Sequence, residues 1–243
     1  MNNNRQAATI AASSRKIAIA AGVLYLLTFV SIPTLSLYGQ VKSENYIIGA
    51  GPDTAAIIGG ILEIIVALAG IATAIVLFSV LKKQSEGLAL GLVASRVLEA
   101  STIFLGVAFL LSIVTLRQAG AGVDALVTSR TLVALYDRIF LLGQSFMPAV
   151  NDLLLGFLLY KSRLVPRSLS LIGLVGGPVL IAGYIAVLFG LIGQHAPLTG
   201  LFALPVALFE FSLGVWLTVK GFNSSAITSL SAKTETNEPL SRA

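Results

Sequence analysis

Seven ionisable residues lie inside long apolar segments of this chain, where charged side chains are rare. They comprise five acids and two bases: Glu63, Arg96, Glu99, Asp137, Arg138, Asp152 and Glu210. In a membrane-spanning helix each would cost roughly 2.5–3.5 kcal/mol at mid-depth, so such residues usually face a bundle interior or a water-filled cavity. Carboxylates and guanidinium groups in that setting bind protons, cations or one another.

Four of these residues are predicted to lie in one layer of the membrane. Counted from the basic residues at one end of each span, at about 1.5 Å per helical residue, they lie about 13–20 Å deep. They belong to three different spans: Arg96, Glu99, Asp152 and Glu210. Because Arg96 and Glu99 are three residues apart, they share a helix face. We expect these four residues to form an intramembrane binding site.

The other three lie nearer the opposite membrane surface by the same count. Glu63 is expected at a depth of about 28 Å, and Asp137 and Arg138 at more than roughly 30 Å. We favour a structural or interfacial role for these three secondary positions.

Polar residues also follow helical spacing along the fourth apolar segment. Asp137, Gln144, Asn151 and Asp152 are predicted to form one polar stripe. Pro148 lies within the stripe and is expected to kink the helix, which would free backbone carbonyls toward a cavity.

The balance of charge in these segments is the strongest indication of function in the sequence. Full ionisation would leave five minus two, or three, net negative charges in a low dielectric. We therefore expect some acids to be protonated at neutral pH or to hold a cation. Arg96 is expected to neutralise only one neighbouring acid directly. In the structural alternative, Arg96 forms a buried ion pair with Glu99 or Asp152 that fixes helix packing.

Composition indicates a membrane protein. Of 243 residues, 56% are hydrophobic and 11% are charged, and the mean hydropathy is +0.92. An ordinary soluble domain has roughly 25% charged residues, so a soluble enzyme, a disordered chain and a nucleic-acid-binding domain are excluded. Six apolar runs are long enough to span a membrane as helices: 17–37, 55–81, 88–116, 132–160, 169–193 and 198–219. The predicted fold is an all-α six-helix transmembrane bundle.

The basic residues predict the orientation of the bundle. Eleven Lys and Arg flank the spans on one side and three on the other. This bias places both termini in the cytoplasm and explains most of the net charge of +5 without a nucleic-acid partner. We expect a short polar N-terminus over 1–14, a transmembrane domain over 15–222 and a disordered cytoplasmic tail over 223–243.

Small and aromatic residues predict packing details. The pairs Gly87–Gly91 and Gly173–Gly177 have the small-xxx-small spacing that allows close helix approach, which we expect within the chain. Tyr38 lies near a span end and is expected to anchor it at the membrane interface.

Sequence motifs for enzymes are absent. The chain has no Cys and one His, His195, so neither a thiolate nor a multi-histidine metal site is expected. No P-loop, dinucleotide fingerprint or nucleophile elbow occurs. We therefore predict no catalytic residues, no metal and no cofactor, and an enzymatic role is not favoured.

Three stretches together resemble a known family. They are RKIAIAAGVLYLLTFV, KKQSEGLALGLVASRVLEA and DLLLGFLLYKSRLVPRSLSLIGLVGG. Over about 15–220 the chain is similar to the bacterial multi-pass membrane family defined by domain of unknown function DUF4386. The resemblance implies a six-helix bundle in a bacterial inner (plasma) membrane and supplies no functional residues.

Three functional hypotheses remain open. The first is a small carrier, or a binder, of a cationic or protonatable solute or a proton, using the four-residue site. The second is an accessory or assembly subunit that pairs with a partner membrane protein. The third is a membrane-embedded enzyme acting on a lipid or an isoprenoid, for which carboxylates would have to serve as general acid and base.

Overall fold

The computed structural model describes residues 2–237, with side chains from residue 12 to residue 232, and within that range it contains helices and no strands. The α-helices are α1 (Asn2–Thr28), α2 (Thr34–Leu37), α3 (Thr54–Leu81), α4 (Glu86–Gln118), α5 (Leu126–Phe140), α6 (Met147–Ser162), α7 (Arg167–Leu188), α8 (Pro197–Val219) and α9 (Ser224–Asn237). Short 3-10 turns cover Phe29–Ser31, Tyr46–Ile48 and Gly122–Ala125, and a π-helix covers Leu141–Phe146.

Six helical segments are long and apolar enough to cross a membrane, as predicted: Ala12–Leu37, Thr54–Leu81, Glu86–Gln118, Gly122–Ser162, Arg167–Leu188 and Pro197–Val219. The protein is therefore an all-α, multi-pass membrane protein. The fourth segment begins at Gly122 rather than at 132, because helix continues through a more polar stretch. The fifth ends at Leu188 rather than at 193, because Gly190 adopts a φ of +70° and the Leu191 N–H caps the Ala186 carbonyl.

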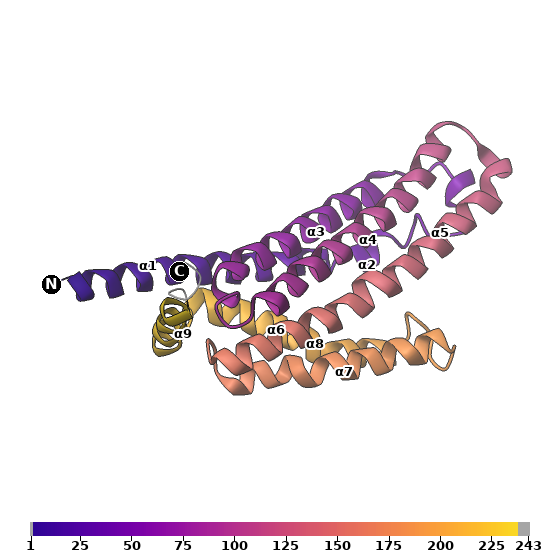
Figure 1. Cartoon of the computed structure of the whole chain (residues 1–243). Coiled ribbons are helices and arrows are strands. Elements are labelled where there is room, and N and C mark those ends of the chain that lie inside the picture. Colours follow the sequence, from indigo (N-terminus) through magenta and orange to yellow (C-terminus); the bar gives the residue numbers. More distant parts are fainter. Residues whose placement is uncertain (1, 238–243) are drawn as a thin grey trace.

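The spans are arranged as a closed ring of neighbours. Helix α1 packs against α3 and α8, α4 packs against α3, α5 and α6, and α7 packs against α6 and α8. Consecutive spans form antiparallel hairpins, and the contact between α1 and α8 closes the ring (Figure 1). We call the end where α1 begins and α9 lies the terminal end. The other end, the far end, carries the connections 38–53 and 189–196.

Helix α3 shows how residue size sorts the inside of the ring from the outside. Ile61, Leu68 and Ile75 recur every seven residues and are more than half exposed, at 53%, 55% and 57%. Small residues such as Ala67 and Ala74 lie about 100° around the helix from this row and are buried. Without a hydrophobic force between helices in lipid, small residues let backbones approach while large apolar residues face the lipid tails.

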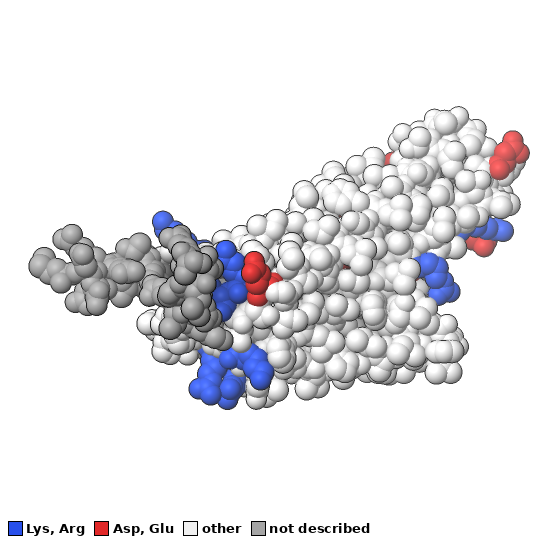
Figure 2. Space-filling view, in the orientation of Figure 1, with Lys and Arg blue, Asp and Glu red and all other residues white. Residues whose placement is uncertain are grey.

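Charged side chains are concentrated at the two ends of the bundle. Figure 2 shows Lys and Arg near the terminal end, further charges at the far end and a broad white surface between them. This surface matches the hydrocarbon band that a membrane-spanning bundle needs. Four of the seven ionisable residues within the spans are buried: Glu63, Arg96, Glu99 and Asp152.

The C-terminal segment differs from the sequence expectation. In place of the disorder expected for 223–243, residues 224–237 form α9, and Ala226, Ile227 and Leu230 pack into the main apolar core at the terminal end. Their spacing places all three on one side of a short helix, and the Asn223 N–H donates to the Leu164 carbonyl just before it. Helix α1 likewise begins at Asn2, within the expected polar N-terminus. Residues 1 and 238–243 lie outside the described residues.

Candidate intramembrane site

Arg96 is the centre of a polar cluster in the middle of the bundle. Its side chain is 6% exposed, and its Nη1 donates to Glu99 Oε2 at 3.0 Å while its Nη2 donates to Glu210 Oε1 at 2.6 Å. The same Nη2 donates to the Tyr25 hydroxyl at 3.2 Å. One guanidinium thus joins α1, α4 and α8, and it pairs with two acids where the sequence predicted one. The planar guanidinium carries five N–H donors, which makes this double pairing possible.

A neutral side chain, Asn151, holds Glu99 from the neighbouring helix α6. The Asn151 amide donates to Glu99 Oε2 at 2.7 Å, and the Ser95 hydroxyl donates to Asn151 Oδ1 at 2.5 Å. Asn151 is fully buried. The carboxylate of Glu99 is therefore held by Asn151 as well as by Arg96, and Ser95 orients the amide of Asn151.

Asp152 lies behind this cluster without a direct hydrogen bond. It is fully buried, and neither of its carboxylate oxygens has a hydrogen-bond partner within the described residues. It interacts electrostatically with Glu210, Arg96 and Glu99. The structure therefore brings three of the four predicted residues into direct contact and leaves Asp152 in range of their charges. If all four are ionised, the group carries three negative charges and one positive charge.

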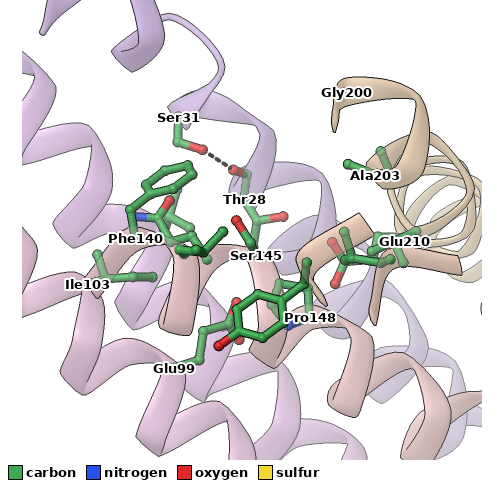
Figure 3. Close-up of a pocket in the computed structure, with 18 of the residues that line it drawn as sticks. Thr28, Ser31, Glu99, Ile103, Phe140, Ser145, Pro148, Gly200, Ala203 and Glu210 are labelled. Atoms are coloured by element: carbon green, nitrogen blue, oxygen red, sulfur yellow. Dashed lines mark hydrogen bonds between the residues drawn. The ribbon is translucent and has the colours of Figure 1, made fainter. Parts of the chain in front are cut away.

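A cavity of about 390 Å³ opens next to this cluster. Arg96, Glu99 and Glu210 line its inner end, whereas Gln194 and Gly200 line it at the far end of the bundle. Figure 3 shows Glu99 and Glu210 on different walls of this space, together with Ser145 and Pro148. The cavity thus extends from the connections at the far end to the buried charges.

The π-helix forms one wall of the cavity. Leu141, Gln144 and Ser145 line the cavity, and Pro148 is the second residue after the end of this segment. Proline has no N–H and clashes with the carbonyl four residues earlier, and a π-helical turn is one way in which a helix accommodates such an interruption. The helix that was expected to kink at Pro148 thus contains a π-helix just before this residue.

Gly143 is the position that allows this wall to approach α4. A Cβ atom at Gly143 would lie 1.9 Å from the hydroxyl oxygen of Thr102, which is too close for any side chain. Thr102 in turn donates to the Glu99 carbonyl at 2.6 Å. Glycine at this position lets the π-helix pack directly beside the turn that carries Glu99.

Glu63 forms a second, separate polar cluster. It is fully buried, although the depth count placed it close to the opposite membrane surface. Tyr38 donates to its Oε2 at 3.1 Å, and Tyr136 and Gln144 donate to its Oε1 at 2.9 and 3.2 Å. Tyr38, predicted as an interfacial anchor, is 3% exposed. An aromatic and aliphatic core at the far end surrounds this group.

Asp137 and Arg138 lie outside both clusters. Asp137 pairs with Lys42 at 2.6 Å and is 28% exposed, and Lys42 also lies 4.4 Å above the ring of Tyr136. Arg138 is exposed and forms no ion pair within residues 12–232. The predicted polar stripe is therefore divided: Asp137 pairs with Lys42, Gln144 donates to Glu63, and Asn151 donates to Glu99.

Asp53, outside the spans, organises the connection at the far end. Tyr46 and Gln118 donate hydrogen bonds to its carboxylate, and Arg117 forms an ion pair with it. The pKa of Asp53 is lowered, mainly by the hydrogen bond from Tyr46. The hydrogen bond from Gln118 and the positive charge of Arg117 lower it further. This group holds the connection against α4 and is remote from the cavity residues.

Three side chains that complete the clusters were not predicted: Tyr25, Ser95 and Tyr136. Tyr25 had a detectable signal, because it lies in the middle of the first span and not at its end. Ser95, which precedes Arg96, had no detectable sequence signal, because serine is common in transmembrane helices that pack closely.

Comparison with known proteins gives a family and no functional relative. No curated protein and no solved structure matches the chain. One family model, described as a domain of unknown function, matches residues 20–221, which include all four residues of the predicted site and the Glu63 cluster. The family resemblance of the sequence is thereby confirmed. The chain belongs to the DUF4386 family.

Proposed function

We propose that this membrane protein is a small carrier, or a binder, of a cationic or protonatable solute, which it holds at Arg96, Glu99 and Glu210. The observation that carries the proposal is the placement of two carboxylates and one guanidinium at the wall of a 390 Å³ cavity in the centre of the bundle. These three groups together have one negative charge in excess when ionised.

The hydrogen bonds leave part of each carboxylate available. Both contacts to Glu99 use its Oε2, and the contact to Glu210 uses its Oε1. Glu99 Oε1 and Glu210 Oε2 have no hydrogen bond within the described residues, and both side chains line the cavity. A cation or a proton entering the cavity would therefore meet two acceptor oxygens and an uncompensated negative charge.

Asp152 supports the same proposal from behind the cavity. Asp152 is fully buried, and neither of its carboxylate oxygens has a hydrogen-bond partner within the described residues. Such a group is costly as a fixed structural element, so packing alone does not account for an acid at this position.

The proposal also includes the membrane and the orientation. We propose the plasma membrane, with both termini in the cytoplasm, because basic residues are enriched at the terminal end. The cavity would then open toward the outside of the cell. Reporter fusions after Lys83 and after Gln194 distinguish the two orientations, since only one of these connections can be cytoplasmic.

A ligand screen with purified protein tests the binding function. Potassium, methylammonium, guanidinium and benzyltrimethylammonium chlorides are each added at constant ionic strength, and the melting temperature is recorded. A solute that binds the folded state raises the melting temperature, so at least one of these cations is expected to stabilise the wild type. In proteoliposomes, uptake of a radiolabelled form of that cation separates a carrier from a binder.

The matched control uses the same chemical change on the surface. Glu210→Gln is expected to abolish the stabilisation by the cation, and Glu44→Gln to preserve it, because Glu44 is 75% exposed and lies in the connection before α3. A screen in which none of the four cations changes the melting temperature of the wild type contradicts the proposed function.

A further inference from the structure

We infer that the solute is an amphiphilic organic monocation, a substituted ammonium with an apolar body, with its charged group at Glu99 and Glu210. This inference rests on the proposed function and specifies its substrate class. It comes from the distribution of groups along the cavity, in which the excess charge is confined to one end.

The inner end of the cavity has the charge of a monovalent cation site. Arg96 cancels one of the two carboxylates, so one added positive charge makes the three wall residues neutral. The free oxygens of Glu99 and Glu210 come from α4 and α8, so a single ammonium group can contact both helices. A divalent ion would leave an excess of positive charge on this wall.

The walls above the charged residues are aromatic. Phe202 lies eight residues before Glu210 on α8, which corresponds to about 12 Å toward the far end at about 1.5 Å per residue. Phe29, Phe140 and Tyr184 line the same space from the Phe29–Ser31 turn, α5 and α7. A ring about 12 Å from the carboxylates is too distant for a cation–π contact with a charged group bound there, but it accepts the apolar part of the same ligand. The aromatic walls favour an organic cation over a strongly hydrated inorganic one.

The arrangement of ligands does not favour a metal ion. Within the described residues, no three His, Asp or Glu side chains converge closely enough to hold one. Asp152 is not among the residues that line the cavity. Potassium and sodium need several oxygen ligands to replace their water, whereas a substituted ammonium carries its charge on an already apolar surface.

The size of the cavity also fits a small organic molecule. Pockets for small ligands have volumes of about 300–1,000 Å³ and combine apolar walls with a few placed polar groups. The cavity of 390 Å³ lies at the lower end of this range. It accommodates a cation with one ring or a short branched chain.

Binding of radiolabelled benzyltrimethylammonium to the full-length protein in nanodiscs tests the inference, with empty nanodiscs as background. Two competitors separate the two halves of the ligand. Neopentylbenzene has the same shape with carbon in place of the charged nitrogen, and tetramethylammonium has the charge without the ring. We expect each to compete at least tenfold more weakly than unlabelled benzyltrimethylammonium.

Variants connect the binding to the cavity. Glu210→Gln is expected to weaken binding at least tenfold, and Glu44→Gln to leave it unchanged. Ala203→Phe provides a second test if Glu210→Gln does not fold, because Ala203 lines the cavity on α8 and the added ring would occupy it (Figure 3). Ala203→Phe is likewise expected to reduce binding at least tenfold.

The outcomes distinguish the two proposals. If tetramethylammonium or potassium binds as tightly as benzyltrimethylammonium and the binding depends on Glu210, the inference about the apolar body is wrong and the proposed function stands. If neopentylbenzene competes as strongly as unlabelled benzyltrimethylammonium, the positive charge does not contribute to binding, and both the inference and the proposed function are wrong. If none of these cations binds, both are also wrong.

Discussion

Two buried carboxylate clusters lie along the same bundle, and they differ in how their charge is satisfied. Glu63 accepts hydrogen bonds from three neutral donors, Tyr38, Tyr136 and Gln144, and is enclosed in an apolar core. Glu99 and Glu210 share one guanidinium and line a cavity, and among residues 12–232 each keeps one oxygen without a hydrogen bond. The first group is complete without a ligand, and the second is not.

This difference separates a structural role from a binding role. A buried polar group that is fully hydrogen-bonded contributes to a unique packing, whereas an incomplete group is costly unless another partner arrives. The presence of a charged residue in a span does not make this distinction, because the insertion cost is similar for all seven residues. The partners decide it, and they come from α1, α4, α5, α6 and α8.

The largest effect on stability is expected from Arg96→Met. The substitution keeps the volume and removes the cation that holds Glu99 and Glu210, so two acids remain buried without their partner. Removing one member of a buried ion pair costs about 3–5 kcal/mol. Thermal unfolding in detergent measures it. Arg130→Met, which affects a pair that is at least 60% exposed, is the control and should cost less than about 1 kcal/mol. Equal stability of Arg96→Met and the wild type would contradict an ion-paired cluster.

Glu63→Leu is expected to have the second largest effect and to leave cation binding intact. It deprives three donors of their acceptor, at a cost of about 2–3 kcal/mol. Glu63→Gln retains one acceptor oxygen and should cost about half as much. Unfolding and benzyltrimethylammonium binding are measured on the same samples. A loss of cation affinity in Glu63→Leu at unchanged fold would show that the two clusters act together.

Gln144 tests the separation of the clusters more finely. It donates to Glu63 and also lines the cavity. Gln144→Met should cost about 1 kcal/mol in the wild type and much less in a Glu63→Leu background, because the same hydrogen bond is lost only once. In the double variant with Glu210→Gln, the stability costs of Gln144→Met and Glu210→Gln should add. A double-mutant cycle by thermal unfolding gives both coupling energies, and strong coupling to Glu210 would contradict two independent groups.

Glu210→Gln and Glu99→Gln are expected to change stability least, by no more than about 1 kcal/mol in either direction. Each amide retains an acceptor for Arg96 and removes one excess negative charge, and functional residues are often held at some cost to stability. Thermal unfolding at neutral pH tests this, with Glu44→Gln as the control. If the two variants lose several degrees or do not fold, the carboxylates belong to a structural network, and a partner protein would be sought before a solute.

The two glycine pairs show that a sequence pattern alone does not predict a close helix contact. Gly173 and Gly177 do sit at close helix contacts, where an added Cβ would lie 2.7 Å from Phe209 and 2.7 Å from Leu153. Gly87 and Gly91 have the same spacing, but nothing lies within 4 Å of a Cβ at either position. The small-xxx-small pattern permits a close approach. Whether a neighbour uses it depends on the arrangement of the helices.

The sequence by itself determined the six spans, the membrane class and the convergence of Arg96, Glu99 and Glu210, because hydropathy and helical rise act within each segment and need no knowledge of neighbours. Only the tertiary structure decided that Arg96 serves two acids, that Glu63 is enclosed by two tyrosines and that α9 packs on the bundle. These contacts join helices far apart in the chain. They depend on rotation about each helix axis and on the π-helix before Pro148, which the spacing of residues along one helix does not specify.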